Sequence, residues 1–194
     1  MRRISFRMNL FKRNKEEDIV NLFKQGNPQA MNKLYKEYAD YLTGVCARYI
    51  SDEDDLKDIL QEGFIKIFTQ ISTFEYRGVG SLKAWMTKII INEALFFLRR
   101  EKIKTSLIEN NLPDLPDEEP DIEGISADVI VRFIQELPAG YRAVFNLYVM
   151  EGKSHNEIAQ ILNIKADSSA SQLHRAKNML AKKINAYKTK MNNL

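Results

Sequence analysis

The clearest chemical signature lies between residues 152 and 183, where the sequence predicts two short helices with a tight break between them. The second helix carries hydroxyl, amide, imidazole and basic side chains: Ser168, Ser171, Gln172, His174, Arg175 and Lys177. Such groups can contact base edges or phosphates, and Arg175 and Lys177 are best suited to phosphate. The pattern is typical of a helix-turn-helix whose second helix enters the major groove of DNA. Arg142, upstream of this motif, is a further candidate for phosphate contact.

Capping signals define these two helices. Ser154 and Glu157 have the Ser-x-x-Glu spacing of a capping box, which satisfies backbone donors in a first helical turn. Asn163 can adopt the left-handed conformation that ends a helix. We expect the second helix to bury one face and to place Asn178 on another side; the buried face carries Ser169, Leu173, Ala176 and Leu180.

A second group of candidates follows a predicted helix from Ser81 to about Lys102 and the loop before it, 72–80. At 100° per residue, one narrow stripe of this helix contains Ser81, Trp85, Lys88, Asn92, Phe96 and Arg99. The loop adds Phe74, Tyr76 and Arg77. Aromatic rings stack on unpaired bases and cations follow phosphates, so the group suits single-stranded DNA. The alternative is that Trp85 belongs to the core and that the loop aromatics are anchors.

A third group lies on the predicted helix from Asp54 to Ile71. Asp55, Asp58 and Glu62 recur at helical spacing with Gln61 nearby, whereas the apolar periodicity places Phe64 on the buried face. Such an acidic row is either a solvated helix face or a docking face for a basic helix pair of a partner protein.

Composition indicates how these groups are organised. The chain has 194 residues, and an acidic, proline-containing stretch (net charge −7 over 101–128) separates two basic blocks. No strand-like alternation is convincing, so we predict an all-α fold of two small helical domains joined by a flexible acidic linker. The segments are a basic flexible arm (1–14), an N-terminal helical bundle (15–103), the linker (104–125) and a helix-turn-helix domain (126–194).

Several classes of protein are not favoured. No apolar run approaches the roughly 20 residues of a membrane-spanning helix, and no secretory signal is recognisable, which predicts a cytoplasmic protein without membrane insertion. Cys46, the single cysteine, falls in an apolar helical pattern and is expected in the core. His155 and His174 have no neighbours at metal-ligand spacing, and no Walker loop or nucleophile elbow occurs. We therefore expect no metal, no cofactor and no enzymatic activity.

Two blocks of sequence together resemble a known family. The first block contains Asp58-Ile-Leu-Gln61-Glu62-Gly-Phe64, Gly80-Ser81-Leu-Lys-Ala-Trp85 and Leu98-Arg99-Arg100, and the second contains Leu137-Pro138, Tyr141-Arg142 and Ser171-Gln172-Leu173-His174-Arg175. In this order, and separated by an acidic linker, they resemble the extracytoplasmic-function (ECF) sigma factors. These are small initiation subunits of bacterial RNA polymerase in the sigma-70 superfamily.

The resemblance implies roles and partners. The stretch Asp55, Asp58, Gln61, Glu62 and Phe64 would dock on the clamp helices of core RNA polymerase. The loop and helix carrying Phe74 to Arg77, Trp85, Lys88, Asn92, Arg99 and Arg100 would melt and capture the −10 element of promoter DNA. The C-terminal domain would read the double-stranded −35 element, and an anti-sigma factor would hold the protein inactive.

The sequence departs from the family pattern at three positions. Phe96 replaces a usual aspartate, and Ala170 stands where a basic residue is frequent. Lys165 replaces the usual Ser or Thr before the second helix of the motif, so we expect the cap to move to Asp167 or Ser168. The promoter sequence therefore cannot be copied from relatives.

We thus predict an ECF-type sigma factor. The alternatives are a stand-alone dimeric helix-turn-helix regulator, which would bind a palindrome without polymerase, and an interaction adaptor, which would need no DNA and would tolerate Arg175→Ala.

Overall fold

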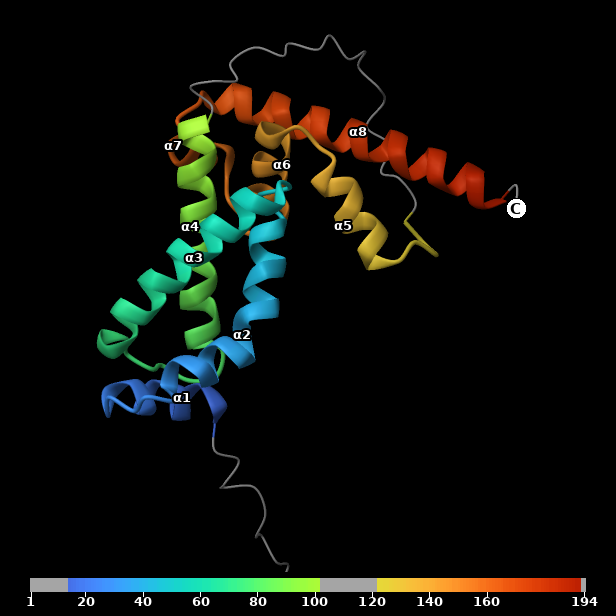
Figure 1. Ribbon diagram of the computed structural model, residues 1–194. Coiled ribbons are helices and arrows are strands. Elements are labelled where there is room, and N and C mark those ends of the chain that lie inside the picture. The colour runs from blue at the N-terminus through green and yellow to red at the C-terminus, as the bar shows by residue number, and fades with distance from the viewer. Residues whose placement is uncertain (1–13, 102–121, 193–194) are drawn as a thin grey trace, which may run out of the picture.

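The structure, a computed structural model, describes residues 14–101 and 122–192. The predicted arm, except Asn14, and most of the predicted linker lie outside these ranges. The helices are α1 (Lys15–Lys24), α2 (Ala30–Ala47), α3 (Glu53–Gln70), the 3-10 turn η1 (Ile71–Thr73), α4 (Ser81–Glu101), α5 (Ala127–Gln135), α6 (Ala139–Phe145), the π-helical turn η2 (Asn146–Met150), α7 (His155–Leu162) and α8 (Ala166–Asn192). The described residues contain no strand, which confirms the all-α prediction (Figure 1).

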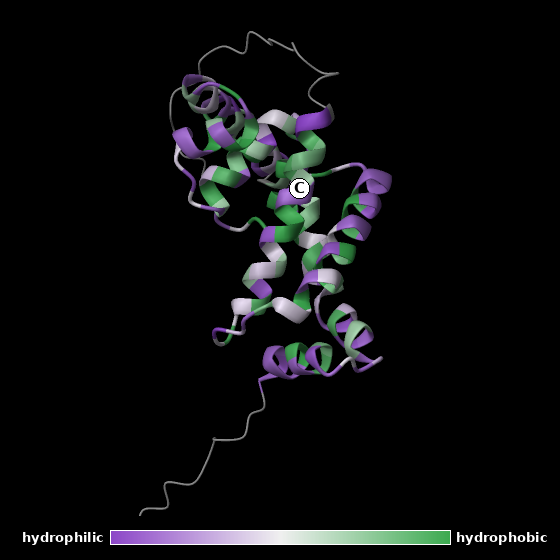
Figure 2. Cartoon of the chain, turned by 90° about the vertical axis from the view of Figure 1, so that its left-hand side faces the viewer, coloured by the Kyte–Doolittle hydropathy of each residue, from purple (hydrophilic) through white to green (hydrophobic). Residues whose placement is uncertain are grey.

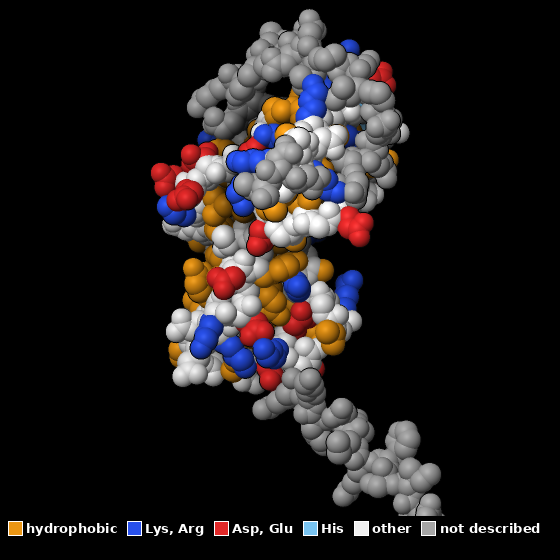
Figure 3. All heavy atoms as spheres, turned by 90° about the vertical axis from the view of Figure 1, so that its right-hand side faces the viewer, with side chains coloured by type: hydrophobic (Ala, Val, Ile, Leu, Met, Phe, Trp, Pro, Cys, Tyr) orange, Lys and Arg blue, Asp and Glu red, His pale blue; other side chains and the backbone are white. Residues whose placement is uncertain are grey.

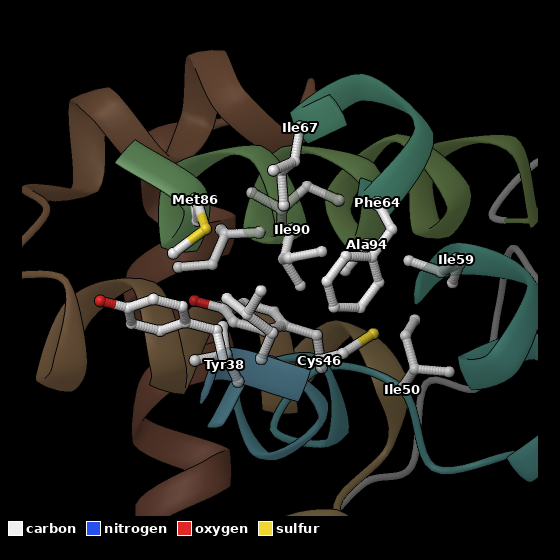
Figure 4. Packing of buried hydrophobic residues seen from close by; sticks show 14 of the residues in the cluster. Tyr38, Cys46, Ile50, Ile59, Phe64, Ile67, Met86, Ile90 and Ala94 are labelled. Atoms are coloured by element: carbon white, nitrogen blue, oxygen red, sulfur yellow. The ribbon is translucent and has the colours of Figure 1, made fainter. Parts of the chain in front are cut away.

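The N-terminal half is a bundle in which α2, α3 and α4 pack against one another, with α1 crossing one end (Figure 1). Its core is apolar (Figure 4) and takes one stripe from each helix, including Leu42, Ile67 and Ile90, none of which is exposed. Cys46 is fully buried as predicted, and this burial raises the pKa of its thiol to about 12. A thiol with so high a pKa is protonated at neutral pH, so it serves as a core residue.

An aspartate side chain caps the start of α3. Asp52 lies just before the helix in an extended conformation, and its carboxylate accepts the N–H groups of Asp54 (3.0 Å) and Asp55 (3.0 Å). These two donors have no partner within the helix, so the aspartate stabilises the first turn.

The C-terminal half contains α5, α6, η2, α7 and the long helix α8, which crosses the others (Figure 1). A small core joins α5 to the middle of α8; its buried members are Ile134, Leu137, Ala176, Leu180 and Ile184. In Figure 2, hydrophobic residues lie mainly on helix faces turned toward the inside of the molecule.

The two halves share one apolar core. Ala143, Val144 and Leu147 of α6 and η2 belong to the same buried cluster as Tyr49 and Ile50, which follow α2. The contact between the halves therefore excludes water.

Polar contacts in this interface are directed at the end of α2. The Arg142 guanidinium donates to the Tyr49 carbonyl through Nε (3.0 Å), and the Asn146 amide donates to the Arg48 carbonyl (2.6 Å). The Gln135 amide donates to the Ala47 carbonyl (3.2 Å). Carbonyls at a helix C-terminus have no partner within the helix, so side chains of the C-terminal half satisfy them here.

Gly63 on α3 allows α3 and α4 to approach closely, whereas Gly44 on α2 is exposed and faces open space. A Cβ at position 63 would overlap the Cδ1 atom of buried Ile90. Replacing a mid-helix glycine by alanine gains about 1 kcal/mol of helix propensity, but overpacking a core costs about 1–3 kcal/mol. We expect Gly44→Ala to raise the thermal midpoint and Gly63→Ala to lower it, measured by circular dichroism. Equal stabilisation by both would contradict the close approach of α3 and α4.

Asn146 tests the contact between the two halves. Asn146→Asp would turn a carboxylate toward the carbonyl oxygens of Arg48 and Arg142, which now accept bonds of 2.6 Å and 3.0 Å. A buried charge facing other acceptors costs several kcal/mol. We expect a larger radius of gyration in small-angle X-ray scattering and a lower thermal midpoint. The exposed Asn156→Asp is the matched control. Scattering and stability equal to those of the wild type would count against this interface.

Candidate nucleic-acid interface

The loop before α4 and the start of α4 surround an open hollow of about 790 Å³. Its lining residues are Gln70, Thr73, Phe74, Glu75, Arg77, Ser81, Ala84 and Trp85. The Phe74 and Trp85 rings are half-buried and lie 5.0 Å apart between centroids, tilted by 38°. Arg77 is exposed beside them and pairs with exposed Glu75 (3.4 Å). The hollow therefore combines a partly exposed aromatic wall with a cation, which is what an unpaired base and its phosphate require.

Hydrogen bonds hold the loop in this shape. The Ser81 hydroxyl donates to the Gly78 carbonyl (2.7 Å) and accepts the Arg77 N–H (3.2 Å). The Asn14 amide donates to the Tyr76 hydroxyl. Burial, followed by the charges of Glu16 and Glu17, raises the pKa of Tyr76. Tyr76 thus anchors the loop, as the alternative interpretation of the sequence expected for it.

The predicted stripe on α4 lies at the surface. Lys88, Asn92, Arg99 and Arg100 are exposed, and the Phe96 ring is 50% exposed. The guanidinium carbons of Arg99 and Arg100 lie 6.0 Å and 5.8 Å from the centroid of this ring. Arg99 also donates to the Ile161 carbonyl of α7 (3.1 Å). These basic groups remain accessible to a polyanion. Phe96, which replaces the aspartate usual in the family, places an aromatic ring beside the guanidinium groups of Arg99 and Arg100.

The helix-turn-helix forms with the predicted caps. The Ser154 N–H donates to the Glu157 carboxylate (2.9 Å) and the Ser154 hydroxyl accepts the Glu157 N–H (3.3 Å), which completes the capping box. The backbone hydrogen bond from Ser154 is the main reason that the pKa of Glu157 falls to about 2. Asn163 ends α7 in the left-handed conformation, with φ 54°. The sequence therefore located both ends of α7 correctly.

The candidates on α8 differ in exposure. Ser171 and Lys177 are exposed, whereas Ser168, Gln172, His174 and Arg175 are half-buried. The Arg175 guanidinium donates to the Tyr141 hydroxyl (3.3 Å), so part of this side chain is occupied within the domain.

Two expectations for α8 are wrong. Asn178 is 8% exposed and packs inside the domain, where its amide contacts the His174 ring (3.5 Å). The helix begins at Ala166, before Asp167 and Ser168, so the cap has not moved to either residue. The face carrying Ser169, Leu173, Ala176 and Leu180 is buried as predicted.

Arg142 does not lie where the sequence prediction put it. It is 4% exposed, and besides the Tyr49 carbonyl its guanidinium meets the carbonyls of Gln135 and Leu137. Burial lowers the pKa of this guanidinium. In this arrangement Arg142 holds backbone carbonyls and is not accessible to a DNA phosphate. The sequence alone could not distinguish these two uses of an arginine.

The acidic face of α3 is accessible, with one exception. Asp58, Gln61 and Glu62 are exposed and Asp55 is half-buried. Phe64 is 7% exposed and packs between Tyr35 and Phe68, with ring centroids 5.0 Å and 5.8 Å away. The periodicity of the sequence placed Phe64 correctly in the core, and its predicted contact with polymerase is contradicted by this burial.

Sequence reasoning missed apolar and acidic residues near these sites. Tyr35 and Ile65 are 54% and 48% exposed on α2 and α3. Ile65 follows Gln61 by one turn, a spacing that could have extended the acidic row. Glu16 in α1 and Asn14 just before it contact the loop, and neither carried a local signal.

Within 14–101 and 122–192, no group of three or more histidine, cysteine or acidic residues could hold a metal ion. None of the helices in these ranges is long and apolar enough to cross a membrane. Figure 3 shows a face on which positive and negative side chains are interspersed, with hydrophobic side chains reaching the surface between them.

Comparisons with known proteins agree with the two halves. The family model for sigma-70 region 2 matches residues 34–103, and that for sigma-70 region 4 matches residues 127–180, together more than half of the chain. The ECF RNA polymerase sigma-E factor of Haemophilus influenzae is 28% identical over 184 residues, covering 87% of this chain and 95% of the relative. The sigma-E factor of Escherichia coli K12 is 25% identical over 182 residues, covering 87% and 94%.

A solved structure of CnrH in complex with the cytosolic domain of CnrY is also similar, with 19% identity, a TM-score of 0.45 and coverage of 89% of this chain and 98% of that chain. The family models and the relatives identify the chain without it. The chain belongs to the ECF group of the sigma-70 family, whose members are promoter-recognising subunits of RNA polymerase and not enzymes.

Proposed function

We propose that this sigma factor docks on core RNA polymerase through the outer face of α3 and contacts promoter DNA with both halves. The docking face consists of Asp55, Asp58, Gln61 and Glu62, extended by the exposed apolar side chain of Ile65. Carboxylates suit the basic clamp helices that the family resemblance implies as the partner. Phe64 acts beneath this face as a core residue.

The single-stranded −10 element is assigned to the hollow and to α4. The Phe74–Trp85 wall offers stacking, and Arg77, Lys88, Arg99 and Arg100 supply positive charge along the path of the strand. Asn92 is exposed and offers an amide to a base edge. The hollow beside an aromatic pair is the observation that supports this assignment most directly.

The double-stranded −35 element is assigned to α8. Ser171 and Lys177 form the accessible part of the predicted set, and His174 lies midway between them around the helix. Arg175 and Gln172 lie beyond Ser171, on the side away from Lys177, and are half-buried. Arg142 is left out of the contact set in this arrangement because it is buried.

We propose that the protein acts in the bacterial cytoplasm and that an anti-sigma factor restrains it. A stand-alone dimeric regulator is not favoured, because region 2 similarity covers most of the N-terminal half. An adaptor without a need for DNA does not account for the hollow or the helix-turn-helix.

Run-off transcription tests the proposed function as a whole. Core RNA polymerase would be incubated with a pooled genomic template, with and without this protein. We expect discrete new transcripts only when the protein is present, and their start sites would reveal both promoter elements. If neither core binding nor new transcripts appear, the proposed function fails. A stand-alone regulator that binds DNA without polymerase then becomes the leading candidate.

Trp85 is the only tryptophan in the chain, so its fluorescence reports on the hollow directly. The Trp85 signal in the holoenzyme is obtained by subtracting the fluorescence emission of core polymerase. Titration with the non-template strand of the −10 region should shift this difference spectrum, because bases that stack on the Trp85 ring change its environment. We expect Phe74→Ala to weaken this strand's binding about tenfold, since loss of one stacking ring costs about 1–3 kcal/mol. Phe133→Ala, a ring in the C-terminal half, is the control. Equal binding by both variants would remove the hollow from the −10 assignment.

A further inference from the structure

Glu16 is a buried carboxylate that the functional assignment does not yet use. It lies in the first turn of α1 and is 7% exposed. It also lies outside residues 34–103, the part of the N-terminal half that matches sigma-70 region 2. A buried carboxylate must be satisfied by hydrogen bonds or by opposite charge, so its partners indicate what it does.

Those partners are backbone donors at the start of α4. Oε2 accepts the N–H of Gly80 (2.9 Å) and of Leu82 (3.3 Å), and Oε1 accepts the N–H of Lys83 (3.4 Å). The Tyr38 hydroxyl donates to Oε1 at 3.4 Å. Leu82 and Lys83 are the second and third residues of α4, whose N–H groups have no acceptor within the helix.

Gly80 explains why the acceptor comes from another helix. It immediately precedes α4, at the position where a Ser, Thr, Asp or Asn side chain normally accepts these N–H groups. Its φ is +88°, a conformation that disfavours residues with a side chain. The loop geometry therefore excludes an ordinary cap, and Glu16 supplies a charged acceptor that also interacts favourably with the positive end of the helix dipole.

The same few residues shape the hollow. Ser81, Ala84 and Trp85 line it from the first two turns of α4, and Arg77 lines it from the loop. Asn14, which caps α1 by accepting the Glu16 N–H (3.2 Å), also bonds to Tyr76 in that loop. The start of α1 thus holds the loop at Tyr76 and the helix at Gly80, on either side of Arg77.

We propose that Glu16 is a positioning residue for capture of the single-stranded −10 element. It fixes the first turn of α4 so that Trp85 and Arg77 face the strand together. This inference rests on the proposed function, because it assigns Glu16 a part in the same site. Glu16 itself touches no DNA.

The test compares Glu16→Gln with Glu17→Gln in the holoenzyme. Both variants remove one negative charge from the first turn of α1, but Glu17 is exposed. Binding to core, to −35 duplex and to the single-stranded −10 non-template strand would be measured separately, with the promoter taken from the run-off experiment. We expect Glu16→Gln to bind the single strand about tenfold more weakly, with core and −35 binding unchanged. Glu17→Gln should match the wild type in all three.

Hydrogen exchange provides a readout at the residues concerned. The amides of Gly80, Leu82 and Lys83 should exchange faster in Glu16→Gln, whereas amides in the middle of α3 should not change. If Glu16→Gln does not fold, Glu16→Asp replaces it; this variant keeps the charge but retracts the carboxylate by one methylene, so it should also weaken single-strand binding.

The outcomes separate the inference from the proposed function. If the wild-type holoenzyme neither initiates transcripts nor binds the single strand, the proposed function fails. If the wild type does both and Glu16→Gln binds the strand as tightly as Glu17→Gln, only the positioning role is overturned. A uniform loss of core, −35 and −10 binding by the folded Glu16 variant would also overturn it, since that result indicates a general structural role.

Discussion

The organisation of this molecule depends on the backbone groups that helix ends leave unpaired. A helix N-terminus offers N–H groups and a C-terminus offers carbonyls, and burying either without a partner is costly. Here the N-terminus of α4 and the C-terminus of α2 are both partly buried against other elements. Side chains distant in sequence satisfy them: Glu16 for α4, and Arg142, Asn146 and Gln135 for α2.

This constraint links the fold to the site. Because Gly80 has no side chain that could cap α4, Glu16 of α1 accepts the N–H groups at the start of this helix, in the same turns that carry Trp85 beside the hollow. Because the end of α2 is satisfied by α5 to η2, the helix-turn-helix has a defined place beside the bundle. Hydrogen bonds to charged groups contribute about 1.5–3 kcal/mol each. A few of them are therefore significant against a total stability of about 5–15 kcal/mol.

Features that depend on near neighbours could be predicted from the sequence. The capping box at Ser154 and Glu157, the left-handed Asn163 and the all-α class all rest on residues within about one turn of one another. Periodicity also placed Cys46 and Phe64 in the core. It misplaced Asn178, because the apolar periodicity of the helix does not reveal that this amide is buried in contact with the His174 ring. Contacts such as Glu16 with Gly80 span more than 60 residues and leave no local pattern.

Arg99 and Arg142 show why the predicted site could only be partly correct. Both are basic residues near predicted DNA-contacting elements, so a DNA contact is predicted for each from the sequence. Arg142 is buried and its guanidinium meets carbonyls of Tyr49, Gln135 and Leu137. Arg99 is exposed and donates to the Ile161 carbonyl, and a guanidinium has five N–H donors. Since a phosphate oxygen is a stronger acceptor than a carbonyl, Arg99 can bind a strand without giving up a buried contact. Arg142 would first have to leave the interface that joins the two halves.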